Sequence, residues 1–182
     1  MMAGMGRLVG RRPDPTASIA RALRSELAPG EQVVAGVYVQ VPGVNEAAMS
    51  GGASGAVAAA TGSGVAFRDV DGDQPAWVAA AGAMGIAPDD ARRMTWSALA
   101  LTTSRLLVAR RSRLSRRVAG VVAAWPVGEI ERIEVPRQRE ALTIHRGDRS
   151  LDFELPAAHK FLPDVYRELP TRLAEVRAAT RT

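Results

Sequence analysis

The residues best suited to chemistry in this sequence are arginines that follow one another without an intervening acid. They lie between positions 105 and 117 and are Arg105, Arg110, Arg111, Arg113, Arg116 and Arg117. A planar guanidinium forms paired hydrogen bonds with phosphate oxygens, so the cluster predicts a site for anions or an anionic membrane surface. The net charge of the chain is +5, so the other residues sum to about −1 and the basic character is local. A solvated loop that only aids solubility remains the alternative.

Catalytic and metal-binding patterns are weaker. The chain has no cysteine and two histidines, His145 and His159, so a zinc site would need two carboxylates as well. The histidines fall on a predicted strand and at a predicted helix start, and no nucleophile elbow lies near them. A phosphate loop is incomplete, because Phe67 stands where a third glycine should follow Gly62 and Gly64. We therefore expect a non-enzymatic protein with no catalytic residue, no metal and no cofactor.

Acidic residues give no better candidate. The stretch from Asp69 to Asp73 resembles the start of a calcium loop. An EF-hand requires glycine at the sixth position and glutamate at the twelfth, where this chain has Gln74 and Ala80. The motif therefore fails, and a solvated turn is the better interpretation. The pair Asp89 and Asp90 is likewise predicted to lie in a loop.

The arginines follow a hairpin predicted over residues 98–108. Two apolar runs flank the polar residues 102–104, and Leu99 and Leu101 fall on one face of the first strand. A longer strand is predicted over residues 33–41, because alternate positions are apolar. Later in the chain, strands are expected around Ile133 and over residues 142–155, with a turn at 146–149.

Helices are predicted on both sides of these strands. Apolar residues recur every three or four positions in the segments 14–27, 75–86 and 162–176. Pro170 should kink the last helix or divide it in two, because an internal proline removes a hydrogen bond and costs about 3 kcal/mol. Residues 1–13 have little to bury and are expected to be disordered.

Residues 43–94 interrupt the pattern between the first two strands. Their central part is rich in glycine and alanine and carries no charge from Ala47 to Phe67. Gly51 and Gly55 have the spacing of packed membrane helices. The span contains too few strongly apolar residues to insert into a bilayer, so we expect no transmembrane segment. A flexible loop or a loosely packed helical hairpin is expected.

Four short motifs, in their order along the chain, resemble those of bacterial pleckstrin-homology-like (PH-like) domains, close relatives of GRAM domains. They are Leu27-Ala28-Pro29-Gly30-Glu31, the run Leu99-Ala100-Leu101-Thr102 with Arg105-Leu106-Leu107-Val108, Trp125-Pro126-Val127, and Ile130-Glu131-Arg132-Ile133. The resemblance implies a mainly β, α+β fold. About seven strands would form a bent antiparallel sheet, closed by a C-terminal helix. Residues 14–182 would form this single domain, with an N-terminal helix and the insertion 43–94 between strands 1 and 2.

The resemblance also implies a function as an interaction module. The arginine run would join the third and fourth strands at the rim where PH domains bind lipid headgroups, although the family's lysine-rich headgroup motif is absent. The expected partner is a protein or an anionic membrane surface. Nucleic-acid binding through residues 105–117 is the alternative, less favoured because the eight aromatic residues do not interleave with the arginines. The N-terminus lacks the apolar core of a signal peptide, which predicts a cytoplasmic protein. With an anionic membrane as its partner, the protein would be peripheral at the inner membrane face.

Overall fold

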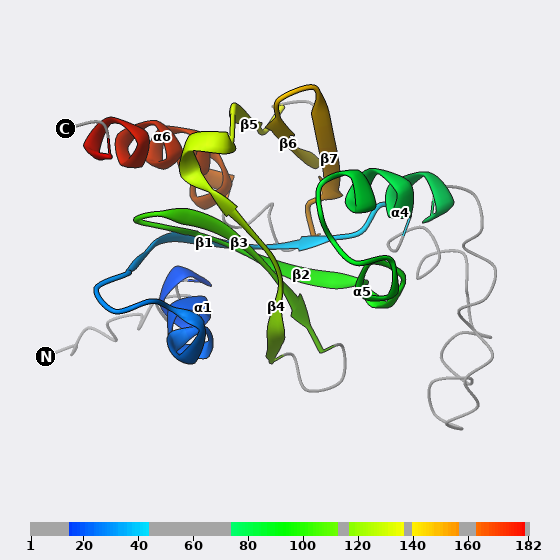
Figure 1. Cartoon of the computed structure of the whole chain (residues 1–182), viewed down its shortest axis with the longest axis horizontal. Helices are drawn as coiled ribbons and strands as arrows, with labels where there is room; N and C mark the ends of the chain where they lie inside the picture. Colours follow the sequence, from blue (N-terminus) through cyan, green and yellow to red (C-terminus); the bar gives the residue numbers. More distant parts are fainter. Residues whose placement is uncertain (1–14, 44–73, 113–116, 137–139, 157–162, 181–182) are drawn as a thin grey trace, which may run out of the picture.

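The chain folds around one bent, seven-stranded antiparallel sheet in the computed structural model (Figure 1). The structure describes residues 15–43, 74–112, 117–136, 140–156 and 163–180. Residues 1–13, which were predicted to be disordered, and the Gly/Ala-rich run lie outside these ranges. With an N-terminal and a C-terminal helix beside the sheet, the described residues confirm the predicted mainly β, α+β fold.

The strands follow the order β4-β3-β2-β1-β7-β6-β5 across the sheet. They are β1 (Val33–Gln40), β2 (Trp96–Thr102), β3 (Arg105–Arg111), β4 (Val118–Pro126), β5 (Arg132–Glu134), β6 (Ala141–Arg146) and β7 (Arg149–Glu154). The helices are α1 (Pro15–Ala22), α4 (Gln74–Ala83), α5 (Pro88–Arg93) and α6 (Pro163–Ala179), with 3-10 turns η1 (Arg24–Glu26) and η2 (Val127–Glu129). Strand β1 pairs with β7 only at Gln40 and Glu154, and the sheet divides there into halves of four and three strands.

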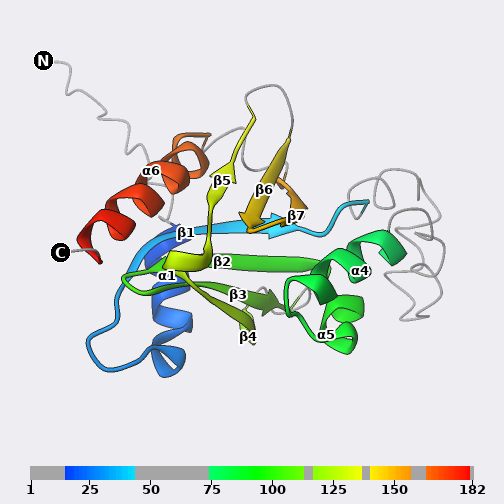
Figure 2. The same cartoon turned by 45° about the horizontal axis from the view of Figure 1, so that its top comes forward.

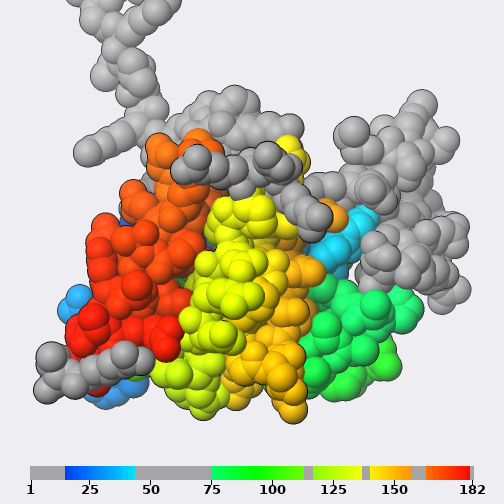
Figure 3. All heavy atoms as spheres, turned by 90° about the horizontal axis from the view of Figure 1, so that it is seen from above, coloured from blue at the N-terminus to red at the C-terminus, as the bar shows by residue number. Residues whose placement is uncertain are grey.

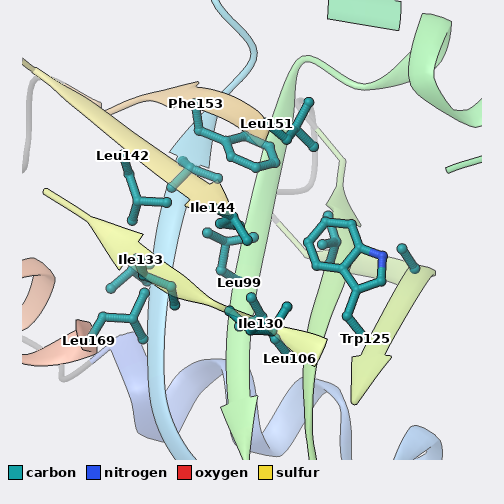
Figure 4. Packing of buried hydrophobic residues seen from close by; sticks show 14 of the residues in the cluster. Leu99, Leu106, Trp125, Ile130, Ile133, Leu142, Ile144, Leu151, Phe153 and Leu169 are labelled. Carbon is teal, nitrogen blue, oxygen red and sulfur yellow. The ribbon is translucent and has the colours of Figure 1, made fainter. Parts of the chain in front are cut away.

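The main core fills the space between the two halves of the sheet. Figure 4 shows Leu99 of the four-stranded half next to Ile144 of the other half, with Leu106 beside Ile130 and Phe153 near Leu151 in the same cluster. Helix α6 closes one side of this core and α4 another: viewed from above, α6 lies beside η2 and β5, and α4 lies beside the β6–β7 hairpin (Figure 3). Leu99 and Leu101, which the sequence placed on one face of the first hairpin strand, are both buried. Apolar residues of the second hairpin strand, the later strands and the last helix are buried as well: Leu106, Leu107, Val108, Ile133, Ile144, Phe153 and Leu169.

A second apolar cluster lies on the opposite face of the four-stranded half, under α1. Ile19 is buried there against alanines that β2 and β3 present on this face. A Cβ atom at Gly36 would lie 3.1 Å from Ile19 Cδ1 and 3.2 Å from Thr16 Cα, so a larger residue would require α1 to shift away from β1. The Gly36 amide also donates a hydrogen bond to Thr16 Oγ1 at 3.1 Å. The sequence predicted one buried face for β1, whereas the described strand is covered on both.

The last part of the predicted insertion belongs to the core. Trp77 and Met84 of this region are buried, and Trp77 Nε1 donates to the Asp152 carbonyl at 2.8 Å. The helix predicted over 75–86 ends earlier, at Ala83. Asp89 and Asp90 lie in the first turn of α5, a helix that was not predicted, and not in a loop.

Helix α6 runs from Pro163 to Ala179 as one helix. Of the two outcomes predicted for Pro170, a kink or two consecutive helices, the second is therefore wrong. Pro163 occupies the first position, where no intrahelical N–H is needed. Four side chains on one face of α6 are buried, and this packing outweighs the cost of the internal proline: Tyr166, Leu169, Leu173 and Val176. Burial raises the pKa of the Tyr166 phenol, whose hydroxyl donates to the Tyr38 carbonyl at 2.8 Å.

Candidate functional site: the arginine rim

The predicted site residues fall at opposite ends of strand β3. Arg105 is the first residue of this strand, and Arg110 and Arg111 are the last two. Six residues of extended chain separate Arg105 from Arg111, a distance of about 20 Å. Arg117 comes just before β4, next to Arg111, whereas Arg113 and Arg116 lie outside the described residues. We call the end formed by Arg110, Arg111 and Arg117 the arginine rim.

Arg105 is bound to a carboxylate of the chain itself, away from the rim. Its Nε and one terminal nitrogen donate to the two oxygens of Glu31, each at 2.9 Å, and the second bond is also the ion pair between them. The same terminal nitrogen reaches the Glu26 carbonyl at 2.8 Å. The Glu31 side chain is only 3% exposed and that of Arg105 is 31% exposed. A bidentate pair in this setting fixes the start of β3 against the chain before β1.

The other atoms around Glu31 come from the same two sequence motifs. Thr102 Oγ1 donates to its carboxylate at 2.6 Å, Ser104 Oγ at 2.9 Å and the Ala28 amide at 2.9 Å. Hydrogen bonds from Arg105 above all, and from these groups, lower the pKa of Glu31 to about 2. The motifs at 27–31 and 99–108, which carried the family resemblance, therefore meet in one buried, charged cluster that holds the β2–β3 hairpin in place.

Arg110 at the rim is held much more loosely. Its nearest carboxylate oxygen among the described residues belongs to Asp90 of α5, at 3.9 Å. Both side chains are partly open to water, with 35% of Arg110 and 40% of Asp90 exposed. An ion pair this long and this solvated contributes little to stability. The guanidinium of Arg110 thus remains available to an external anion.

Arg111 points to the other face of the sheet, over aromatic rings. Its guanidinium carbon lies 4.2 Å from the centroid of the Tyr38 ring and 5.9 Å from that of Trp96. Trp96 is the cross-strand neighbour of Arg111 in the β2–β3 ladder, and the half-buried Tyr38 comes from β1. A cation over the face of an aromatic ring is attracted by its quadrupole, which orients Arg111 at the rim.

Arg117 closes the base of the loop between β3 and β4. Its carbonyl accepts a hydrogen bond from the Ser112 amide at 2.8 Å, which continues the ladder past Arg111. The side chain of Arg117 is exposed. The rim therefore contributes three guanidinium groups that arrive from adjacent ends of two paired strands.

The sequence did not predict that aromatic residues lie beside the rim. The aromatic residues do not interleave with the arginines along the chain, yet the fold brings Tyr38 and Trp96 beside Arg111. The signal for Trp96 was present in the hairpin: a turn at Thr103 and Ser104 sets a register in which Trp96 and Arg111 are opposite. Tyr38 gave no such signal, because the pairing of β1 with β2 spans a long insertion.

Of the two histidines, the structure describes only His145. His145 lies on β6 with its Nε2 3.5 Å from a carboxylate oxygen of Glu134, and His159 lies outside the described residues. No group of three or more acidic, histidine or cysteine side chains that could hold a metal is found among the residues described. None of the described helices is long and apolar enough to cross a bilayer. Compared with known proteins, the chain matches no family model and no curated protein.

Proposed function

We propose that this protein is a non-enzymatic interaction module of PH-like type, which docks onto an anionic membrane surface through the arginine rim. The observation that carries the proposal is the contrast along β3 in the partners of two similarly exposed arginines. Arg105 is paired at 2.9 Å with a carboxylate that is 3% exposed, whereas Arg110 has a carboxylate at 3.9 Å that is 40% exposed. The surface would be the inner face of the cytoplasmic membrane. Arg105 is therefore left out of the contact surface, which comprises Arg110, Arg111, Arg117 and, from the sequence, Arg113 and Arg116.

The sheet architecture supports the PH-like part of the proposal. A bent seven-stranded antiparallel sheet with a helix at its C-terminal end is the arrangement that the sequence resemblance implies. The arginine run then joins the third and fourth strands, where the resemblance expects the ligand-binding rim. Fold likeness alone does not define a ligand, so the charge and geometry of the rim carry the choice of partner.

The rim suits a membrane better than a nucleic acid. Half-buried Trp96 lies next to the cations, and tryptophan favours the interface between lipid headgroups and water. Stacking on bases needs an open aromatic face, whereas Arg111 covers one face of Tyr38 at 4.2 Å. Each arginine near an anionic surface contributes about 1 kcal/mol to binding.

Vesicle co-sedimentation tests the proposal with two variants of equal charge. In one, Arg110, Arg113 and Arg116 are changed to Ser. In the other, the exposed Arg21, Arg24 and Arg167 are changed to Ser. We expect the parent to bind phosphatidylserine vesicles at low salt. The first variant, which loses three arginines of the contact surface, should bind about a hundredfold more weakly, and the control variant should bind nearly as the parent does.

Salt and lipid composition sharpen the same experiment. Binding should weaken as salt rises, because charges are screened over about 10 Å at 0.1 M. No binding by the parent at low salt, or equal losses in the two variants, would refute the membrane proposal. If the parent does not bind vesicles but binds duplex or single-stranded DNA through the same arginines, the result would favour the nucleic-acid alternative.

A further inference from the structure

One of the two acidic residues in the first turn of α5 contacts the arginine rim. Asp90 Oδ1 lies 3.9 Å from Arg110 Nη1, and 40% of the Asp90 side chain is exposed. The neighbouring Asp89 pairs instead with Arg92 of the same helix at 3.2 Å, and 82% of its side chain is exposed. Two adjacent carboxylates of equal charge therefore differ in the arginine that each one contacts.

The position of α5 beside the rim is set by the main core. The helix has only six residues, too few to be stable alone, and Ala91 within it and Met94 directly after it are buried in this core. In Figure 2, strand β3 runs towards α5, and Leu106 and Val108 of β3 belong to the same core. Arg110 continues this alternation along β3, so its side chain leaves the strand on that face. The core thus holds the carboxylate and the guanidinium on the same side of the sheet.

The carboxylate of Asp90 competes with an external anion for the guanidinium of Arg110. The pair is too long and too solvated to add much to stability, so an anion can displace it. The negative charge nevertheless lies next to the rim, where it repels an anionic surface that approaches the arginines. A contact that is weak for folding is therefore unfavourable for binding.

We propose that Asp90 is an autoinhibitory contact of the arginine rim, which occupies Arg110 and thereby weakens docking of the protein on an anionic membrane. The inference rests on the function proposed above and concerns the regulation of the same surface. Removal of the Asp90 charge releases the guanidinium, which can then form paired hydrogen bonds with a lipid phosphate. The effect belongs to Asp90 alone, because Asp89 is paired within its own helix.

Vesicle co-sedimentation of two matched variants of the full chain tests this inference. Asp90→Asn and Asp89→Asn each remove one negative charge from the same turn of α5 and preserve the shape of the side chain. At 0.1 M salt, where charges are screened over about 10 Å, Asp90→Asn should bind phosphatidylserine vesicles about fivefold more tightly than the parent. Asp89→Asn should change the affinity by no more than about twofold, because its charge is exposed to water and paired with Arg92. Thermal unfolding should give nearly the same melting temperature for both variants and the parent.

A double variant tests whether the effect passes through Arg110. In the Arg110→Ser background, Asp90→Asn should strengthen vesicle binding by less than about twofold, because the guanidinium that it would release is absent. A fivefold gain that persists in this background would overturn the proposal, since the charge of Asp90 would then act on the whole surface and not on Arg110.

The results for the parent separate this inference from the proposed function. If the parent binds vesicles and loses binding when the rim arginines are replaced, but Asp90→Asn and Asp89→Asn bind alike, only the autoinhibitory contact is wrong. If neither the parent nor Asp90→Asn binds at low salt, the membrane function and the autoinhibitory contact are both wrong.

Discussion

The two ends of strand β3 carry the same residue type in opposite circumstances. At its start, Arg105 is bound to both oxygens of a carboxylate that is 3% exposed. At its end, Arg110 lies 3.9 Å from a carboxylate that is 40% exposed. The difference arises from what the sheet brings alongside each residue, because neighbouring strands and loops supply five donors around Glu31 and only the edge of α5 near Arg110. A run of arginines is thus not one site, and its members have to be assigned individually.

The largest effect should come from removing the anion at the start of β3. Glu31→Gln leaves Arg105 without its charged partner and weakens the bonds from Thr102 and Ser104. Loss of one member of a largely buried pair costs about 3 kcal/mol. Thermal unfolding should show a melting temperature lower by roughly 6 to 12 °C.

A matched control lies five residues earlier. Glu26 is exposed, and only its backbone carbonyl contacts Arg105, so Glu26→Gln should change stability by less than about 0.5 kcal/mol. If the two substitutions were equally mild, Arg105 would be as loosely held as the rim and the contrast along β3 would disappear.

Lowering the pH should reduce the free energy of unfolding by somewhat less than Glu31→Gln does. The pKa of Glu31 is lowered from 4.5 to about 2 by folding, so the unfolded chain binds a proton more readily. The stabilisation is therefore complete above about pH 5.5 and is lost as the pH falls towards 2. After allowance for the solvent around Arg105, the loss should be about 2 kcal/mol.

Denaturant titrations at successive pH values measure this dependence. The parent and Glu31→Gln should differ most near neutral pH and converge near pH 2, because other carboxylates titrate equally in both. If the difference in the free energy of unfolding between the two proteins did not change with pH, the Glu31 carboxylate would not be the group that Arg105 stabilises.

At the other end of β3, Arg111 should have an intermediate effect. Arg111→Gln removes the cation over Tyr38 and Trp96, and a cation–π contact at a partly exposed site contributes about 1 kcal/mol. Arg111→Lys keeps the charge but loses the planar stacking, so its stability should lie between those of Arg111→Gln and the parent. A loss as large as that of Glu31→Gln would place Arg111 among the structural arginines and remove it from the rim.

Much of this fold could be predicted from the periodicity of apolar residues. The hairpin at 98–108, the alternation in β1 and the faces of the last two strands put Leu101, Val37 and Phe153 in the core, where the structure has them. The covering of the second sheet face could not be predicted in the same way. It depends on small residues such as Gly36 and Ala98, whose burial arises from the close approach of α1 and not from their own hydrophobicity.

The local sequence pattern also could not predict which arginines are paired within the fold and which lie at the rim. Arg105 and Glu31 are 74 positions apart, and only the pairing of β1 with β2 brings them together. Pro170 within α6 shows the same limit, since burial of Leu169 and Leu173 on either side outweighs a local preference to break the helix. In each case a long-range contact determined the outcome.

We expect the smallest effect on stability for substitution of Arg110. The same substitution also separates a structural role from a binding role. The pairing of Arg110 with Asp90 is long and solvated, so Arg110→Ser should change the free energy of unfolding by less than about 0.5 kcal/mol. The same substitution should weaken binding to phosphatidylserine vesicles about fivefold, the equivalent of about 1 kcal/mol. Arg24→Ser, on the exposed turn η1, should alter neither quantity by a comparable amount. Stability lost together with binding would mean that Arg110 serves the fold as Arg105 does, and the two ends of β3 would then differ only in degree.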